Sequence, residues 1–101
     1  MSGLKDIVIE EKERLEKLII FYNQEILKYP KGYISKKMRN GNIYYYNSFR
    51  EGKKVKSVYI GKVESPELKE FEKQIDKRKD LEKKLNTTKK NLKEAGKMLN
   101  G

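Results

Sequence analysis

The 101-residue sequence contains no cysteine, no histidine and no tryptophan. Without thiols and imidazoles the chain has no ligands for a zinc site, no thiol nucleophile and no imidazole base. A metal site made of carboxylates alone would need clustered aspartate and glutamate residues. Tyrosine can act as a nucleophile, but no organised base or metal accompanies the tyrosines of this sequence. We therefore expect a protein that is not an enzyme and that uses no cofactor and no metal.

Long apolar runs are missing as well. No segment approaches the roughly 20 apolar residues that a membrane-spanning helix needs. Residues 1–10 lack the basic start and the long apolar stretch of a secretory signal. The absence of cysteine is compatible with a reducing compartment. These features predict a cytoplasmic protein with no membrane partner.

Acidic residues are scarce in the middle third of the chain. Residues 31–63 hold nine basic side chains and one acidic one, whereas residues 1–30 have a net charge of −1 and residues 64–101 of +3. This asymmetry predicts an anionic partner for the middle segment. Lysine outnumbers arginine 21 to 4, an excess that codon usage in an AT-rich genome also produces. Codon usage does not explain why acidic residues are rare between Pro30 and Glu64.

Residues 4–29 have the spacing of an amphipathic helix. The Tyr29-Pro30 pair should end it, because the residue before a proline is pushed out of the helical region. Apolar residues recur at intervals of three and four along one face, and Glu11 interrupts them. This face predicts core packing through Leu4, Val8, Leu15, Leu18, Tyr22 and Ile26.

A second, charged helix is predicted over residues 65–99. It starts with Ser65-Pro66-Glu67, which supplies a capping hydroxyl, a proline at the first helical position and an acidic residue in the first turn. Leucines spaced by seven residues between Leu85 and Leu99 resemble a coiled-coil seam, which the Asn-Thr-Thr sequence at 86–88 weakens. A helix this long and polar should pair with the first helix, form a homodimer or lie on a partner.

The basic segment 31–63 changes to the pattern of a β-meander. Asn40-Gly41 predicts a two-residue hairpin loop, because a type I′ turn needs positive φ at both central positions. Glu51-Gly52 predicts a second tight loop, which places strands at 32–39, 42–49 and 53–62. The chain is thus predicted to be a single α+β domain over residues 1–101, with an N-terminal helix, a three-stranded antiparallel meander and a long C-terminal helix.

These loops predict which side chains share a face of the meander. The first loop places Arg39 opposite Asn42, and the second places Arg50 opposite Lys53 and Tyr46 opposite Ser57. One face is then mostly aliphatic, with Ile34, Met38, Ile43, Tyr45, Phe49, Val58 and Ile60. The other face carries tyrosines, basic residues and serines, namely Tyr33, Ser35, Lys37, Arg39, Tyr44, Tyr46, Ser48, Ser57 and Tyr59.

The tyrosine-bearing face predicts contact with nucleic acid. Aromatic rings can stack on bases while neighbouring ammonium groups neutralise phosphates. Alternatively, a two-stranded ribbon can lie in the DNA major groove. Basic residues beside the second loop predict a tip that touches phosphates. The candidate nucleic-acid-binding residues are Tyr33, Lys37, Arg39, Tyr44, Tyr46, Arg50, Lys53, Lys54, Lys56 and Tyr59.

Two other interpretations of the tyrosines are open. Tyrosine favours strands in general, and its rings can simply cover their neighbours or form a protein interface. A register slip of one residue would exchange the two faces and bury the rings in the core.

The meander resembles a short domain of uncharacterised prokaryotic and phage proteins. The resemblance lies in a glycine-led first strand at 31–37, a Tyr-Tyr-Tyr second strand at 41–46 and a third strand at 50–61 that ends in Tyr-Ile-Gly, followed by a long charged helix. Similar segments lie near the N-termini of some insertion-sequence transposases. Many relatives carry a cysteine cluster between the first two strands, where this chain has the tight turn Arg39-Asn-Gly-Asn42. The resemblance implies a phage or mobile-element context in a bacterial host cell and a connection with nucleic acid.

Two functions fit these observations. The first is a small non-enzymatic protein that binds DNA or RNA largely through the backbone. The second is a phage-encoded inhibitor or adaptor, of the anti-CRISPR type, that docks on a larger nucleoprotein complex. In the second case the basic face would occupy a nucleic-acid path while the long helices contact the protein.

Overall fold

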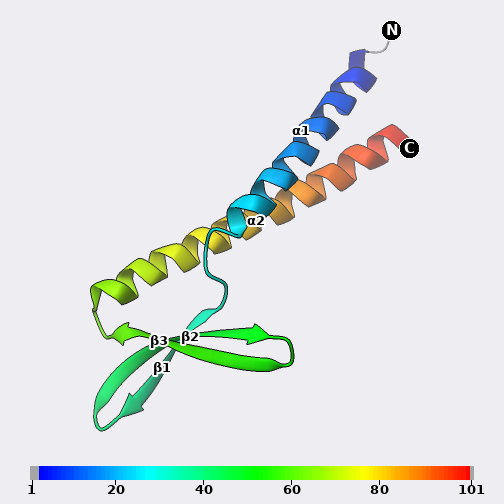
Figure 1. Ribbon diagram of the computed structural model, residues 1–101. Coiled ribbons are helices and arrows are strands. Elements are labelled where there is room, and N and C mark those ends of the chain that lie inside the picture. Colours follow the sequence, from blue (N-terminus) through cyan, green and yellow to red (C-terminus); the bar gives the residue numbers. More distant parts are fainter. Residues whose placement is uncertain (1–2, 101) are drawn as a thin grey trace. The chain divides into compact units, whose positions relative to one another are not determined.

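The computed structural model describes residues 3–100, so residues 1, 2 and 101 of the predicted domain lie outside it. The elements follow one another as predicted (Figure 1), which confirms the α+β layout. The described residues form two compact units, one made of the residues up to Lys28 and from Lys79 onward, the other of Tyr29–Arg78. The elements are α1 (Gly3–Ile26), β1 (Tyr33–Arg39), β2 (Asn42–Glu51), β3 (Lys54–Lys62) and α2 (Pro66–Asn100).

The first unit pairs α1 with the second half of α2. The two segments run antiparallel (Figure 1). A hollow between the start of α1 and the end of α2 is lined by Leu4, Val8, Met98 and Leu99. Both helices contribute residues at alternating intervals of four and three, which is the spacing of a coiled-coil seam. Buried and half-buried side chains mark the two halves of this seam: Val8, Lys12, Leu15, Ile19, Tyr22 and Ile26 on α1, and Leu81, Leu85, Thr88, Leu92, Ala95 and Leu99 on α2.

Two details of the predicted α1 stripe were wrong. Leu4 was expected in the core but is 81% exposed. Lys12 is half-buried at the point where Glu11 was expected to interrupt the face, and Glu11 is exposed. A lysine can hold this position because its aliphatic stem packs while its ammonium group reaches water. Thr88, from the stretch expected to weaken the seam, is buried in it, and its Oγ1 donates a hydrogen bond to the Lys84 carbonyl at 2.7 Å. The helix α1 also ends at Ile26, three residues before Tyr29.

The second unit contains the antiparallel sheet, with strand order β1-β2-β3. Asn40 and Gly41 have φ values of 52° and 79°, as a type I′ turn requires. The register between β1 and β2 is the predicted one, from Arg39 opposite Asn42 to Tyr33 opposite Ser48.

The predicted register between β2 and β3 was wrong by two positions. The loop is Gly52-Lys53 rather than Glu51-Gly52, so that Glu51 pairs with Lys54. Only Gly52 has positive φ, at 63°, which fits a type II′ turn with glycine first. Sliding a two-residue loop by one position moves every cross-strand partner by two, so the side chains keep their faces. The neighbours change, and Tyr46 lies opposite Tyr59 instead of Ser57.

A β-bulge interrupts the pairing near the end of β3. Tyr46 pairs with Tyr59, but the next residue of β2, Tyr45, pairs with Gly61. The extra residue is Ile60, and the inserted position puts Lys62 opposite Tyr44. The tyrosine face, as observed, therefore comprises Tyr33, Ser35, Lys37, Arg39, Asn42, Tyr44, Tyr46, Ser48, Arg50, Val55, Ser57, Tyr59 and Lys62.

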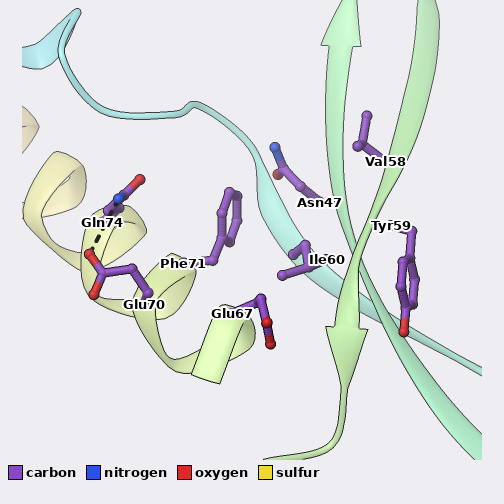
Figure 2. Close-up of a pocket in the computed structure, with 8 residues that line it drawn as sticks. All are labelled: Asn47, Val58, Tyr59, Ile60, Glu67, Glu70, Phe71 and Gln74. Atoms are coloured by element: carbon purple, nitrogen blue, oxygen red, sulfur yellow. Dashed lines mark hydrogen bonds between the residues drawn. The ribbon is translucent and has the colours of Figure 1, made fainter. Parts of the chain in front are cut away.

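The opposite, aliphatic face of the sheet meets the first turns of α2. Val58 and Ile60 lie on the same side as Phe71, whereas the ring of Tyr59 points away from the helix (Figure 2). The helix starts as predicted, since the Leu68 amide donates to Ser65 Oγ at 3.2 Å. Its buried side chains in this unit are Leu68 and Ile75. Within this unit, the aliphatic face is thus directed toward α2 and the tyrosine face away from it.

Within the residues that the structure describes, neither helix contains an apolar stretch long enough to cross a membrane.

Candidate functional site

Three tyrosine rings gather on the tyrosine face. The ring of Tyr59 lies next to both others, with its centroid 6.2 Å from that of Tyr44 and 5.6 Å from that of Tyr46. The ring plane of Tyr59 is tilted by 58° against that of Tyr44 and lies at 67°, edge to face, against that of Tyr46, so neither pair stacks in parallel. Tyr59 is 50% exposed. Planar aromatic surface is therefore accessible at this point of the sheet.

All charged side chains of the tyrosine face are basic. Lys37 lies over the ring of Tyr46, with Nζ 4.8 Å from the ring centroid. Arg39, Arg50 and Lys62 share the face, and among the described residues of the three strands no acidic one does. Ion pairs with acidic side chains, which would weaken the positive field, are thus absent from this face in the described strands, and anions should be attracted to it.

Serine hydroxyls connect the three strands beside the tyrosines. The Oγ of Ser48 lies 2.8 Å from the Oγ of Ser35 on β1 and 3.0 Å from the Oγ of Ser57 on β3. Ser48 is buried, so these hydrogen bonds satisfy a group that has lost contact with water. The row adds side-chain hydrogen bonds between the three strands beside the tyrosine cluster.

A shallow hollow lies within the tyrosine cluster. It has a volume of about 330 Å³ and is lined by Arg39, Asn40, Tyr44, Tyr46 and Tyr59. Its lining is aromatic and basic.

A second hollow, of about 400 Å³, lies between β3 and the start of α2 (Figure 2). Val58, Ile60 and Phe71 supply apolar surface there, and the carboxylates of Glu67 and Glu70 lie at its side. Glu70 Oε1 accepts a hydrogen bond from the Gln74 amide at 3.4 Å. Carboxylates repel phosphate, so of the two hollows only the one on the tyrosine face suits an anionic ligand.

The structure brings together five of the ten predicted site residues. One cluster lies on the tyrosine face near the loop between β1 and β2, and it consists of Lys37, Arg39, Tyr44, Tyr46 and Tyr59.

The other five lie apart from this cluster. Tyr33 and Arg50 share the tyrosine face but lie farther along the strands, and Lys53 lies in the second loop. Lys54 and Lys56 alternate onto the aliphatic face, where Lys56 Nζ makes an ion pair with Glu51 at 2.9 Å. The predicted basic tip is therefore divided between the two faces.

The sequence analysis missed two residues that lie beside this cluster. Asn40 was assigned to the turn alone, yet it lines the hollow. Lys62 reaches the tyrosine face only because of the bulge at Ile60. A glycine inside a strand often marks a bulge, so Gly61 was the signal that could have revealed Lys62.

Within residues 3–100 no three acidic side chains lie close enough to hold a metal ion.

Comparison with known protein families gives a match that covers about two thirds of the chain. A family described as "Domain of unknown function (DUF6788)" matches residues 4–70, which include most of α1, the whole meander and the start of α2. No curated protein and no solved structure matches the chain.

Proposed function

The chain belongs to the family of domains of unknown function DUF6788, and we propose that it is a small non-enzymatic protein that binds DNA or RNA through the tyrosine face. The observation that carries the proposal is the cluster of Tyr44, Tyr46 and Tyr59, whose neighbouring charges are all positive. Ring faces can stack on bases, and each stacked base contributes about 1–3 kcal/mol. Lysine and arginine side chains bind phosphates without reading sequence, so binding should be largely independent of base identity.

The test is a titration with labelled oligonucleotides of mixed sequence, as duplex DNA, single-stranded DNA and RNA. Affinity should fall steeply between about 50 and 200 mM salt, because each phosphate contact releases counterions. Lys37→Glu should weaken binding to every sequence. Lys36→Glu is the matched control, since Lys36 precedes it on the same exposed strand, pairs with Tyr45 and alternates onto the aliphatic face.

Equal losses in the Lys37→Glu and Lys36→Glu variants would show that net charge matters and the tyrosine face does not. Absence of binding at low salt would refute the proposal. The double variant Lys53→Glu with Lys54→Glu tests separately whether the tip of the second hairpin touches phosphates.

A second candidate function is that of an inhibitor or adaptor that docks on a nucleoprotein complex. The exposed apolar side chains of α1 favour it: Ile7 is 62% exposed, Ile20 59% and Phe21 51%. A protein partner could cover them while the basic face occupies the partner's nucleic-acid path. This function predicts no shift of oligonucleotides by the chain alone, and co-purification with a target at a fixed ratio that nuclease treatment leaves unchanged. The phage or mobile-element context, the cytoplasmic location and a homodimer through the C-terminal helix stay predictions.

A further inference from the structure

The hollow on the tyrosine face has the size of a site for one small planar group. Its volume of about 330 Å³ lies at the lower end of the range for small-ligand pockets, roughly 300–1,000 Å³. The ring plane of Tyr59 is inclined by 58° to that of Tyr44 and by 67° to that of Tyr46, so neither pair is stacked in parallel and ring surface is left for a ligand. An aromatic hollow of this kind takes either a cation or a planar aromatic group.

The charges around the hollow decide between these two ligands. Lys37 already places its ammonium group over the ring of Tyr46. Arg39 lines the hollow, and Lys62 lies opposite Tyr44. A cationic ligand would be repelled by these groups, whereas a planar group that carries a negative charge would be attracted. A nucleobase with its phosphate has this combination.

The ring faces also distinguish single-stranded from duplex nucleic acid. In a duplex each base is stacked between its neighbours and shows only its edges in the grooves. A base must be unstacked before it can lie on an aromatic ring, as it is in single strands. We propose that the hollow binds one unstacked nucleobase of a single-stranded segment, with Arg39 placed to contact the adjoining phosphate. This inference rests on the proposed function and adds the form of the nucleic acid to it.

The experiment compares fluorescein-labelled oligothymidylate with its duplex with oligoadenylate at equal salt. The wild-type chain should bind the single strand roughly 5- to 150-fold more tightly, which corresponds to the 1–3 kcal/mol of one stacked base. Tyr44→Leu should lose this preference, because leucine keeps apolar bulk without a ring face. Tyr44→Phe is the matched control and should keep it. If Tyr44→Leu fails to fold, Tyr59→Leu and Tyr59→Phe make the same comparison at the half-exposed ring.

A second measurement does not depend on any variant. The chain has no tryptophan, so its intrinsic fluorescence reports tyrosine, and a base on the ring faces should quench it. An oligothymidylate in which every base is replaced by an abasic site should bind through phosphates alone and give no quenching.

The outcomes separate the two proposals. Salt-dependent binding that is equal for single strand and duplex, with equal affinities of Tyr44→Leu and Tyr44→Phe, would overturn the base site and leave the proposed function standing. Quenching by the abasic strand would also overturn it. No binding of either probe at low salt would remove both.

Discussion

Gly32 lies directly against the side-chain amide of Asn47, at the point where the chain enters β1. A Cβ at position 32 would collide with Asn47 Oδ1 and with the Ser48 carbonyl oxygen. The Asn47 Nδ2 group donates a hydrogen bond to the Lys31 carbonyl at 3.2 Å, and its buried Oδ1 has no hydrogen-bond partner. The glycine lets β1 approach β2 closely enough for the tyrosine face to form.

Gly32→Ala should therefore destabilise the protein, by roughly 2–4 kcal/mol. The new methyl group meets fixed backbone, and the φ of 120° at this position is unfavourable for any residue with a Cβ. Thermal or urea unfolding followed by circular dichroism measures the loss. The control is Gly41→Ala, where φ is 79° but nothing lies within 4 Å of the added Cβ. It should cost only about 1 kcal/mol of left-handed strain, and equal losses for both variants would contradict the collision.

Gly61 and Ser65 should prove coupled. A Cβ on Gly61 would collide with Ser65 Oγ, the hydroxyl that caps α2 by accepting from the Leu68 amide. Gly61→Ala should thus displace the cap and cost about 1 kcal/mol, close to the cost of Ser65→Ala. In the double variant the second substitution should add little, because the hydroxyl is already gone. Unfolding of the four proteins tests this, and fully additive losses would show that the collision is relieved elsewhere.

Replacement of the buried Thr88 should stabilise the helical unit. Its hydroxyl bonds only to the Lys84 carbonyl within the same helix, and it occupies a seam position that a methyl group could fill. Thr88→Val should raise the free energy of unfolding by roughly 0.5–1 kcal/mol. Thr87→Val is the matched control on the same helix, because Thr87 is exposed and should show almost no change. A loss of stability in Thr88→Val would mean that the hydroxyl is needed in the seam.

The Glu11 carboxyl should titrate below its usual range. Hydrogen bonds from the Arg14 guanidinium lower the pKa of Glu11, and the same contact raises the pKa of Arg14. The stabilisation from this pair is present above the pKa of Glu11 in the unfolded chain and is lost as the pH falls through the lower, folded-state pKa. NMR titration should show the Glu11 pKa rising toward its ordinary value of 4.5 in Arg14→Gln. Arg14→Lys keeps the charge without the paired hydrogen bonds and should give an intermediate value; no change in either variant would contradict the pairing.

Turn chemistry explains both the success and the failure of the register predictions. Asn40-Gly41 allows only one position for the first loop, because a type I′ turn needs two adjacent residues that tolerate positive φ. Around Gly52 two loops are possible, one with glycine second and one with glycine first, and the second is a type II′ turn that needs no positive φ at Glu51. The choice between them depends on which cross-strand neighbours pack, and the observed register places Tyr46 against Tyr59. The alternation of side chains along the strands predicted half of the residues that form the cluster, but it did not predict the contact between the rings of Tyr46 and Tyr59.

The sequence alone determined the elements, the helix start at Ser65, the first hairpin and the division of the sheet into two faces. These features depend on short-range preferences that neighbouring residues express by themselves: periodicity, capping and the φ requirements of a turn. Only the tertiary structure decided the position of the second loop, the bulge at Ile60 and the burial of Thr88 in the helical seam. Each of these features depends on whether contacts between residues distant in the sequence outweigh a small local cost in free energy. Only the folded chain brings those residues together.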